Sequence, residues 1–207
     1  MDIESPFAGP PEDTREGILR ASFIVLERYG YSGLTMSRIA EEAGIEKASV
    51  YHYYSDKDSL LLALVDYVIE EMKYRTVQRE DADPLQQLRC FIDQIVFGRQ
   101  INGEPTGFSP PSEETLRVFI QIRAQATHDD AYREKITEIT RLQQDHIRDV
   151  IQAGIDSGQF ADVDAECVAS VVSTLLIGVF SRRVTTNADV EPVREAIHAY
   201  LETVLAD

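Results

Sequence analysis

The sequence predicts an all-α protein with about nine helices, on the strength of three observations. Apolar residues recur three or four positions apart in one segment after another, which is the period of a helix with one buried face. Capping residues such as Thr35, Asp83 and Asp189 stand at the starts of these segments, and glycines such as Gly30 stand at their ends. No segment alternates apolar and polar residues convincingly over the length of a strand.

The first predicted helix covers residues 12–29, has one apolar face and ends at Gly30. Residues 1–11 before it contain three prolines and show no apolar period. We therefore expect them to form a flexible N-terminal arm.

Two short helices joined by a tight turn are predicted next. The first runs from Met36 to Ala43, and Thr35 caps it because its hydroxyl can accept a hydrogen bond from a free backbone N–H. Gly44 ends this helix, since glycine readily adopts the left-handed conformation of a helix C-terminus. The second helix runs from Lys47 to Tyr53, with Val50 facing inward. This is the layout of a helix-turn-helix, whose second helix enters the DNA major groove. A helical hairpin with a solvated polar face is the alternative.

The same segment resembles the N-terminal DNA-binding domain of the TetR family of transcriptional regulators, over roughly residues 14–64. The matching positions are Thr35, Ile39-Ala40, Ala43-Gly44-Ile45, Val50-Tyr51, Tyr54, Lys57 and Leu60. Two positions depart from the family pattern: Tyr53 stands where His is common, and Tyr54 stands where Phe is common.

The resemblance implies a sequence-specific DNA-binding transcriptional regulator, typically a repressor released by a small-molecule effector. Such a protein binds its double-stranded DNA operator as a homodimer. Side chains suited to base edges are Arg38, Lys47, Ser49 and His52, and those suited to phosphates are Arg15, Thr35, Tyr51, Tyr53 and Lys57.

Six longer helices are predicted after the second short helix, and Ser55 or Asp56 caps the first of them. The first three cover about 60–78, 85–99 and 113–127. The fourth starts at Asp129 or Asp130 and ends near 155, and the fifth starts at Asp162 or Asp164 and ends near 184. The last starts at Asp189 and includes Val204. Residues 101–112 contain three prolines and two glycines and form a predicted loop. We expect a DNA-binding domain over 12–57 and a helical ligand-sensing and dimerisation domain over 58–207.

The last two predicted helices are apolar on more than one face, which indicates burial on two sides. A two-fold dimer formed by a four-helix bundle explains this pattern, and the family resemblance implies the same arrangement. The expected interface residues are Val171, Leu175, Gly178, Val193, Ile197, Tyr200 and Leu201. Small residues, Ala169, Ser170, Ser173 and Gly178, are expected on the outward side of the first of these helices.

The resemblance also implies a small-molecule site in the helical domain. Candidate lining residues are Phe91, Ile95, Phe119, Arg123, Tyr132 and Leu142. Arg123 lies on an apolar face, where it can bind an anionic group of a ligand. The alternative is that its head extends to water or pairs with an acidic residue of the chain.

The formal net charge of −16 argues against DNA binding. Residues 1–57 contain six Lys and Arg against ten Asp and Glu, yet Arg15, Arg38, Lys47 and Lys57 lie in or near the helix-turn-helix. We give the local placement of these cations more weight than the net charge, because salt screens distant charges within about 10 Å. The acidity and the four lysines fit either a high-salt cytoplasm or an ordinary acidic protein. An all-α ligand- or protein-binding module that no longer binds DNA is the alternative function.

No group of residues in the sequence points to catalysis, a cofactor or a metal. The four histidines are scattered, and His128 with Asp129 and Asp130 fits a helix cap better than a metal site. We therefore expect neither an enzyme nor a metalloprotein.

Cys90 and Cys167 fall inside predicted helices and fit small core residues in a reducing compartment. The N-terminus lacks the pattern of a signal peptide, and we expect no apolar run to reach membrane-spanning length. A cytoplasmic location follows as an expectation.

Overall fold

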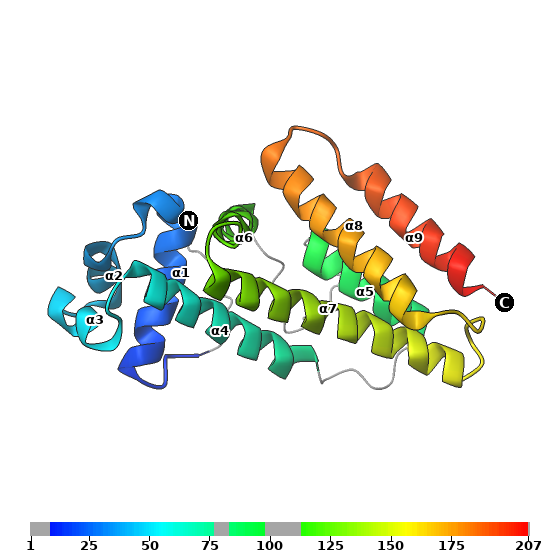
Figure 1. The fold of residues 1–207 in the computed structure, drawn as a ribbon, viewed down its shortest axis with the longest axis horizontal. Coiled ribbons are helices and arrows are strands. Elements are labelled where there is room, and N and C mark those ends of the chain that lie inside the picture. The colour runs from blue at the N-terminus through cyan, green and yellow to red at the C-terminus, as the bar shows by residue number, and fades with distance from the viewer. Residues whose placement is uncertain (1–8, 77–82, 98–112, 207) are drawn as a thin grey trace. The chain divides into compact units, whose positions relative to one another are not determined.

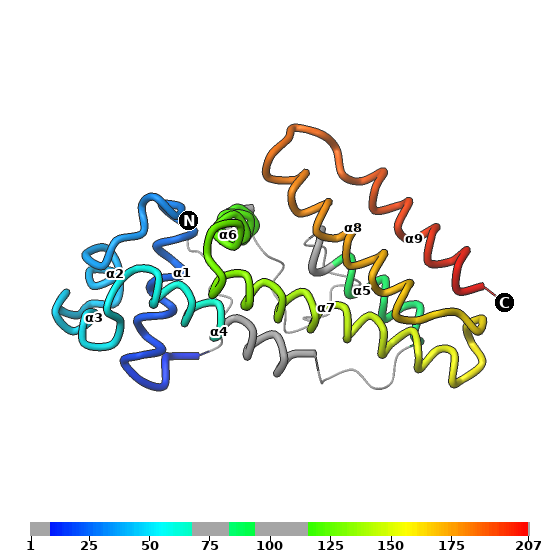
Figure 2. Tube along the Cα trace, viewed as in Figure 1, coloured from blue at the N-terminus to red at the C-terminus, as the bar shows by residue number. Residues whose placement is uncertain are grey.

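The computed structural model describes residues 9–76, 83–97 and 113–206, and within its helices the side chains of 68–76, 94–97 and 113–115 are not described. This part of the chain contains nine helices and no strand, as predicted (Figure 1 and Figure 2). The helices are α1 (Thr14–Gly33), α2 (Met36–Ala43), α3 (Lys47–Tyr53), α4 (Lys57–Thr76), α5 (Pro84–Phe97), α6 (Glu113–Gln125), α7 (Asp130–Asp156), α8 (Ala165–Thr185) and α9 (Glu191–Leu205). The predicted loop 101–112 and most of the N-terminal arm lie outside the described residues.

The chain divides into two compact units. Unit 1 comprises residues 1–72 and 114–136, and unit 2 comprises residues 73–113 and 137–207. Helix α7 therefore contributes its first turns to unit 1 and the remainder to unit 2. The predicted boundary at residue 57, between a DNA-binding domain and a ligand-sensing and dimerisation domain, stays a prediction.

Unit 1 has a core to which each of its first four helices contributes. Ile18 of α1, Ile39 of α2, Val50 of α3 and Leu60 of α4 are fully buried. Helix α1 packs against α2, and α2 packs against α3. Burial of one apolar face per helix gives these short elements stability that a seven-residue helix lacks by itself.

A polar cluster joins α1 to α4 in unit 1. The hydroxyl of Tyr67 donates to Oε1 of Glu16 at 2.5 Å, and Nε of Arg20 donates to the same oxygen at 3.0 Å. Burial, followed by the bond to Glu16, raises the pKa of Tyr67 to about 12. The tyrosine thus stays a hydrogen-bond donor at neutral pH.

Two glycines turn the chain where the sequence predicts it. Gly44 has φ of 67° and ends α2, with its N–H donating to the carbonyls of Ala40 and Glu41. Gly30 also has φ of 67°, but it interrupts α1 rather than ending it, because one further turn runs to Gly33. The predicted break at Gly30 is confirmed, but the helix ends at Gly33, four residues after the predicted last residue, Tyr29.

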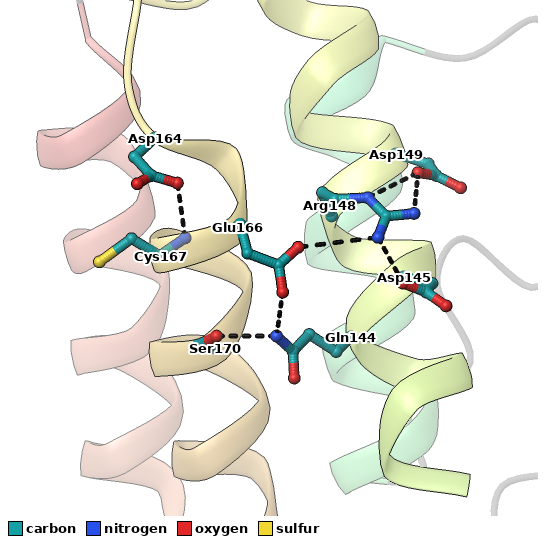
Figure 3. Close-up of polar contacts among 8 residues, drawn as sticks. All are labelled: Gln144, Asp145, Arg148, Asp149, Asp164, Glu166, Cys167 and Ser170. Carbon is teal, nitrogen blue, oxygen red and sulfur yellow. Dashed lines mark hydrogen bonds and ion pairs between the residues drawn. The ribbon is translucent and has the colours of Figure 1, made fainter. Parts of the chain in front are cut away.

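In unit 2, polar contacts join α7 to α8 (Figure 3). Nε2 of Gln144 donates to Glu166 at 2.6 Å and to the hydroxyl of Ser170 at 2.8 Å. Asp164 caps α8 by accepting a hydrogen bond from the backbone N–H of Cys167 at 2.9 Å. These contacts fix the start of α8 beside the middle of α7.

Helix α9 is held to α5 by a buried ion cluster, the Asp93 cluster, formed by Asp93, Arg194 and His198. Nε of Arg194 donates to Oδ1 of Asp93 at 2.6 Å, and Nε2 of His198 lies 2.9 Å from the same oxygen. Burial by itself raises the pKa of Asp93, but the bonds from His198 and Arg194 outweigh it and lower the pKa to about 2.

The orientation of α8 differs from the prediction. Ala169 and Ser173 are buried, whereas Val171 and Leu175 are each 38% exposed. The expectation of small outward residues is thus wrong at these two positions, because small side chains let α8 pack closely against α5 and α9. Cys167 is exposed rather than in the core, whereas Cys90 is buried.

Among the described helices, α8 is long and apolar enough to cross a membrane by length and composition alone, which corrects the expectation from the sequence. The core helix of a soluble protein meets the same criterion. Val172 and Leu176 of α8 are fully buried within unit 2 and so fit a core helix.

Candidate nucleic-acid interface

The helix-turn-helix has the predicted bounds and caps. Thr35 accepts a hydrogen bond from the N–H of Arg38 at 3.3 Å and so caps α2. After Gly44, the N–H of Ile45 donates to the carbonyl of Ala40 at 3.0 Å, which closes the turn. Val50 is fully buried and holds α3 against the rest of unit 1.

The opposite side of α3 carries polar and aromatic side chains. Tyr51 and Tyr53 are 48% and 44% exposed, and Lys47 and His52 are exposed as well. The ammonium of Lys47 lies 5.6 Å from the ring centroid of Tyr51, and the rings of His52 and Tyr53 meet edge to face at 5.4 Å. Ser49 is half-buried. Large aromatic side chains left in solvent suit a binding surface, because they offer apolar area and a polar tip together.

Arg38 is exposed but held in place by the end of α1. Its Nη1 donates to the carbonyl of Gly33 at 2.8 Å, and its guanidinium lies 4.5 Å from the ring centroid of Tyr29. A stacked guanidinium is oriented before it meets a ligand, which lowers the entropic cost of binding.

Tyr54 and Arg15 lie near each other although 39 positions separate them in the sequence. Burial raises the pKa of Tyr54, and the positive charge of Arg15 opposes this shift. Tyr54 is buried, and its hydroxyl makes no hydrogen bond in the described part of the chain. The hydroxyl that distinguishes Tyr54 from the usual Phe therefore does not reach water.

Lys57, the expected phosphate contact at the start of α4, is half-buried. Its Nζ donates to the carbonyl of Tyr31 at 2.6 Å and lies 3.4 Å from the centroid of that ring. Burial lowers the pKa of Lys57. A phosphate contact would therefore have to share or replace the bond to Tyr31.

Tyr31 is a residue that reasoning from the sequence missed. Its N–H donates to Oε1 of Gln121 on α6 at 3.0 Å, and its carbonyl accepts from Lys57. Its pKa is raised by burial and then by the neighbouring Asp58, which also accepts a hydrogen bond from the hydroxyl of Tyr132 at 3.1 Å. Within unit 1, side chains of α6 and α7 thus meet the residues that flank the helix-turn-helix.

The six predicted pocket residues are divided between the two units. Phe119, Arg123 and Tyr132 belong to unit 1, where the guanidinium of Arg123 lies 5.5 Å from the ring centroid of Phe119 and Tyr132 is buried. Phe91 and Leu142 belong to unit 2 and are half-buried, and Phe91 lies 4.6 Å from the ring of His146. The side chain of Ile95 lies outside the described residues, and the pocket stays a prediction.

The predicted dimer residues divide into exposed and buried groups. Val171, Leu175 and Gly178 are exposed on α8, and Val193 and Tyr200 are half-buried on α9. Ile197 and Leu201 are buried within the single chain. Of the predicted interface residues, the exposed ones therefore lie on α8, and the interface itself stays a prediction.

Within the part of the chain that the structure describes, no group of three His, Cys, Asp or Glu side chains could hold a metal ion. Asp129 instead caps α7, accepting a hydrogen bond from the N–H of Ala131 at 2.8 Å. The cap expected from His128, Asp129 and Asp130 is confirmed for Asp129.

Comparisons with known proteins agree with the geometry. Residues 18–64 match the family described as "Bacterial regulatory proteins, tetR family", and residues 107–206 match "BetI-type transcriptional repressor, C-terminal". The chain is 32% identical over 141 residues to the HTH-type transcriptional regulator BetI of Stenotrophomonas maltophilia, a match that spans 67% of this chain and 63% of that protein.

Solved structures show the same fold. A TetR transcription regulator from Haloarcula marismortui is 30% identical, with a TM-score of 0.79 over 93% of this chain and 98% of that one. A transcriptional regulator from Saccharomonospora viridis, solved in complex with choline, is 20% identical, with a TM-score of 0.75 over 93% of this chain and 97% of that one. The chain belongs to the TetR family, and it is a DNA-binding transcriptional regulator rather than an enzyme.

Proposed function

We propose that this chain binds a double-stranded operator through α2 and α3 of two subunits and represses transcription until a small-molecule effector binds. The observation that carries this proposal is the two-sided character of α3. Val50 is fully buried, while Lys47, Tyr51, His52 and Tyr53 stay exposed on the other side. Such a helix is both fixed in the domain and free to meet a groove.

Base reading is assigned to the side chains whose polar atoms lie on α3 or beside it. Lys47, Ser49 and His52 offer donors and acceptors from α3, and Arg38 offers a guanidinium oriented by Tyr29. A good contact to a base edge contributes about 1–3 kcal/mol of discrimination.

Phosphate binding is assigned to Arg15, Thr35, Tyr51, Tyr53 and Lys57. Tyr51 and Tyr53 are the best placed of these, because their rings are about half exposed. Each phosphate that a cation neutralises releases condensed counterions, so binding weakens with salt. The acidic charge of residues 1–57 makes this dependence a sensitive test of the local cations.

A homodimer is proposed through α8 and α9, with Val171 and Leu175 in contact with the second copy. Two apolar side chains that are 38% exposed on one helix gain by burial against a partner. A two-fold dimer presents two α3 helices to half-sites about 34–36 Å apart.

The effector is proposed to bind among the helices that follow residue 57. The Saccharomonospora viridis regulator with the same fold was solved in complex with choline, so this class of fold has room for a small ligand. Candidate lining residues are Phe91, Ile95, Phe119, Arg123, Tyr132 and Leu142.

The test starts from a duplex selected by the protein from a random-sequence library, which removes the need to know the operator. Fluorescence anisotropy then compares this duplex with a scrambled one over a range of salt. His52→Ala should reduce discrimination between the two duplexes, while Tyr53→Phe should weaken binding to both equally. Arg133→Ala, which removes an exposed cation on α7, is the matched control and should leave both affinities unchanged.

Failure to select any sequence, at any salt, would instead support a binding module that has lost DNA recognition. Specific binding that persists in molar salt would support the interpretation of the acidity as an adaptation to a high-salt cytoplasm. Rapid loss of binding on adding salt would favour an ordinary acidic protein.

A further inference from the structure

Helix α6 carries a cation that no described residue neutralises. Nη1 of Arg123 is covered from solvent and makes no hydrogen bond to the described part of the chain. The guanidinium lies over the ring of Phe119, 5.5 Å from its centroid. Burial is the cause that lowers the pKa of Arg123, and no carboxylate opposes this shift.

Other arginines of unit 1 show the contrast. Arg20 pairs with Glu16 at 2.6 Å, and Arg28 pairs with Glu42 at 2.8 Å. A guanidinium taken out of water without a partner is unfavourable, because its lost hydration is not replaced. The contact with Phe119 replaces only part of that hydration, since a cation–π contact is weaker than an ion pair with hydrogen bonds.

We propose that Arg123 binds an anionic group of the effector, a carboxylate or a phosphate, and so makes the effector of this regulator an anion. The proposal rests on the effector-binding function proposed above. A guanidinium presents parallel N–H donors that match the two oxygens of a carboxylate or phosphate. The free Nη1 supplies such a donor, and the apolar side of α6 favours an anion with an apolar or aromatic body.

This assignment separates the chain from a regulator of quaternary ammonium compounds. Choline is a cation, and proteins usually bind such cations against aromatic faces that carry no positive charge. In this chain the face of Phe119 is already covered by the cation of Arg123. A cationic ligand at this place would meet a like charge.

Within unit 1, two hydrogen bonds connect the helix that carries Arg123 to the residues that flank the helix-turn-helix. Gln121, two residues before Arg123 on α6, accepts the hydrogen bond from the N–H of Tyr31. The carbonyl of Tyr31 in turn accepts from Lys57 at the start of α4. An anion that shifts α6 would therefore alter a contact that holds the DNA-binding helices.

The first test measures the ligand-free protein. Because Nη1 of the half-buried Arg123 is covered and has no partner in the described part of the chain, Arg123→Gln removes a charge whose lost hydration is not replaced, and its Tm should equal or exceed that of the wild type. Arg117→Gln removes the same charge from an exposed position of the same helix and serves as the control. A lower Tm for Arg123→Gln than for both other proteins would mean that an acidic group of the chain already pairs with Arg123, and the proposal would be wrong.

The second test adds probes at constant ionic strength and protein concentration: benzoate, inorganic phosphate and choline. At least one of the two anions should raise the Tm of the wild type and of Arg117→Gln saturably. For Arg123→Gln the affinity for that anion should fall by about tenfold or more, the loss expected for one charged hydrogen-bond partner. Equal affinity in Arg123→Gln, no saturable effect of either anion, or stabilisation by choline alone would each overturn the proposal.

Neither measurement contains DNA, so a failure here is distinct from a failure of the proposed function. Operator binding by the ligand-free wild type is measured separately by anisotropy. If the wild type binds its selected duplex but no anion, only the assignment of Arg123 fails. If it binds no DNA, the repressor proposal fails whatever Arg123 binds.

Discussion

Replacement of Asp93 by Asn tests the ion cluster that holds α9, one of the two proposed dimerisation helices. Asp93 is 5% exposed, and Arg194 and His198 both contact its Oδ1. Its pKa is lowered from 3.8 to about 2, so the folded state favours the charged form. At 1.36 kcal/mol per pKa unit, this shift corresponds to about 2.5 kcal/mol of stability at pH 7.

The pH dependence follows from the direction of the shift. Because the folded pKa of Asp93 is depressed, its contribution is complete above the unfolded pKa and is lost as the pH falls from about 4 through about 2. Asp93→Asn should therefore be less stable than the wild type by about 2–3 kcal/mol at pH 7. The difference should shrink to about half near pH 3, because the wild-type carboxyl is then partly protonated.

Urea unfolding followed by circular dichroism at one protein concentration measures this difference. With a slope of about 1–3 kcal/mol per molar urea, the midpoint of Asp93→Asn should lie roughly 1 M lower at pH 7. Asp149→Asn, at an exposed position paired with Arg148, is the control and should leave the midpoint unchanged. Equal stability at pH 7, or a deficit that stays constant into the acid range, would refute the argued role of the Asp93 charge.

Two further predictions concern DNA binding and the dimer. Lys57→Met keeps the apolar stem of the side chain but removes the hydrogen bond to Tyr31, so urea unfolding should show a loss of about 1–2 kcal/mol of stability, comparable to other hydrogen bonds from charged donors. If Nζ also contacts a phosphate, the salt slope of DNA binding should fall by about one. An unchanged salt slope would mean that Lys57 only positions its neighbours. Leu175→Glu, on the exposed side of α8, should shift the protein from dimer to monomer in sedimentation equilibrium and weaken operator binding; a stable dimer would place the interface elsewhere.

The sequence predicted the helix-turn-helix well because its signals are local. The bounds Met36–Ala43 and Lys47–Tyr53, the cap at Thr35 and the left-handed Gly44 all match the structure. Each depends on residues within one helical turn of the boundary, where hydrogen bonding and backbone conformation decide the outcome. The predicted end of the first helix at Gly30 was less accurate, since a left-handed residue permits a further turn.

The buried and exposed faces of α8 could not be assigned from the sequence, because they depend on contacts with residues that are distant in the sequence. Val171, Val172, Leu175 and Leu176 are equally apolar, and the periodic pattern does not say which pair is covered. Packing inside unit 2 determines which side is buried. The side that carries Ala169 is covered, and Val171 and Leu175 are left exposed. The spacing of apolar residues shows how many sides of a helix are buried, but it does not show which element packs against each side.

Lys57 and Arg123 show the same limit for charged residues. A motif places Lys57 where a phosphate is expected, yet its ammonium already bonds to Tyr31, which lies 26 positions earlier in the chain. The sequence places Arg123 on an apolar face, but only the packed structure shows that its Nη1 is covered and without a partner. In both cases the residue type was predictable, and the function depends on whether its charge is already satisfied within the fold. A satisfied charge such as that of Lys57 first holds the structure, whereas the half-buried Arg123, whose covered Nη1 has no partner in the described part of the chain, is where we propose that an anion binds.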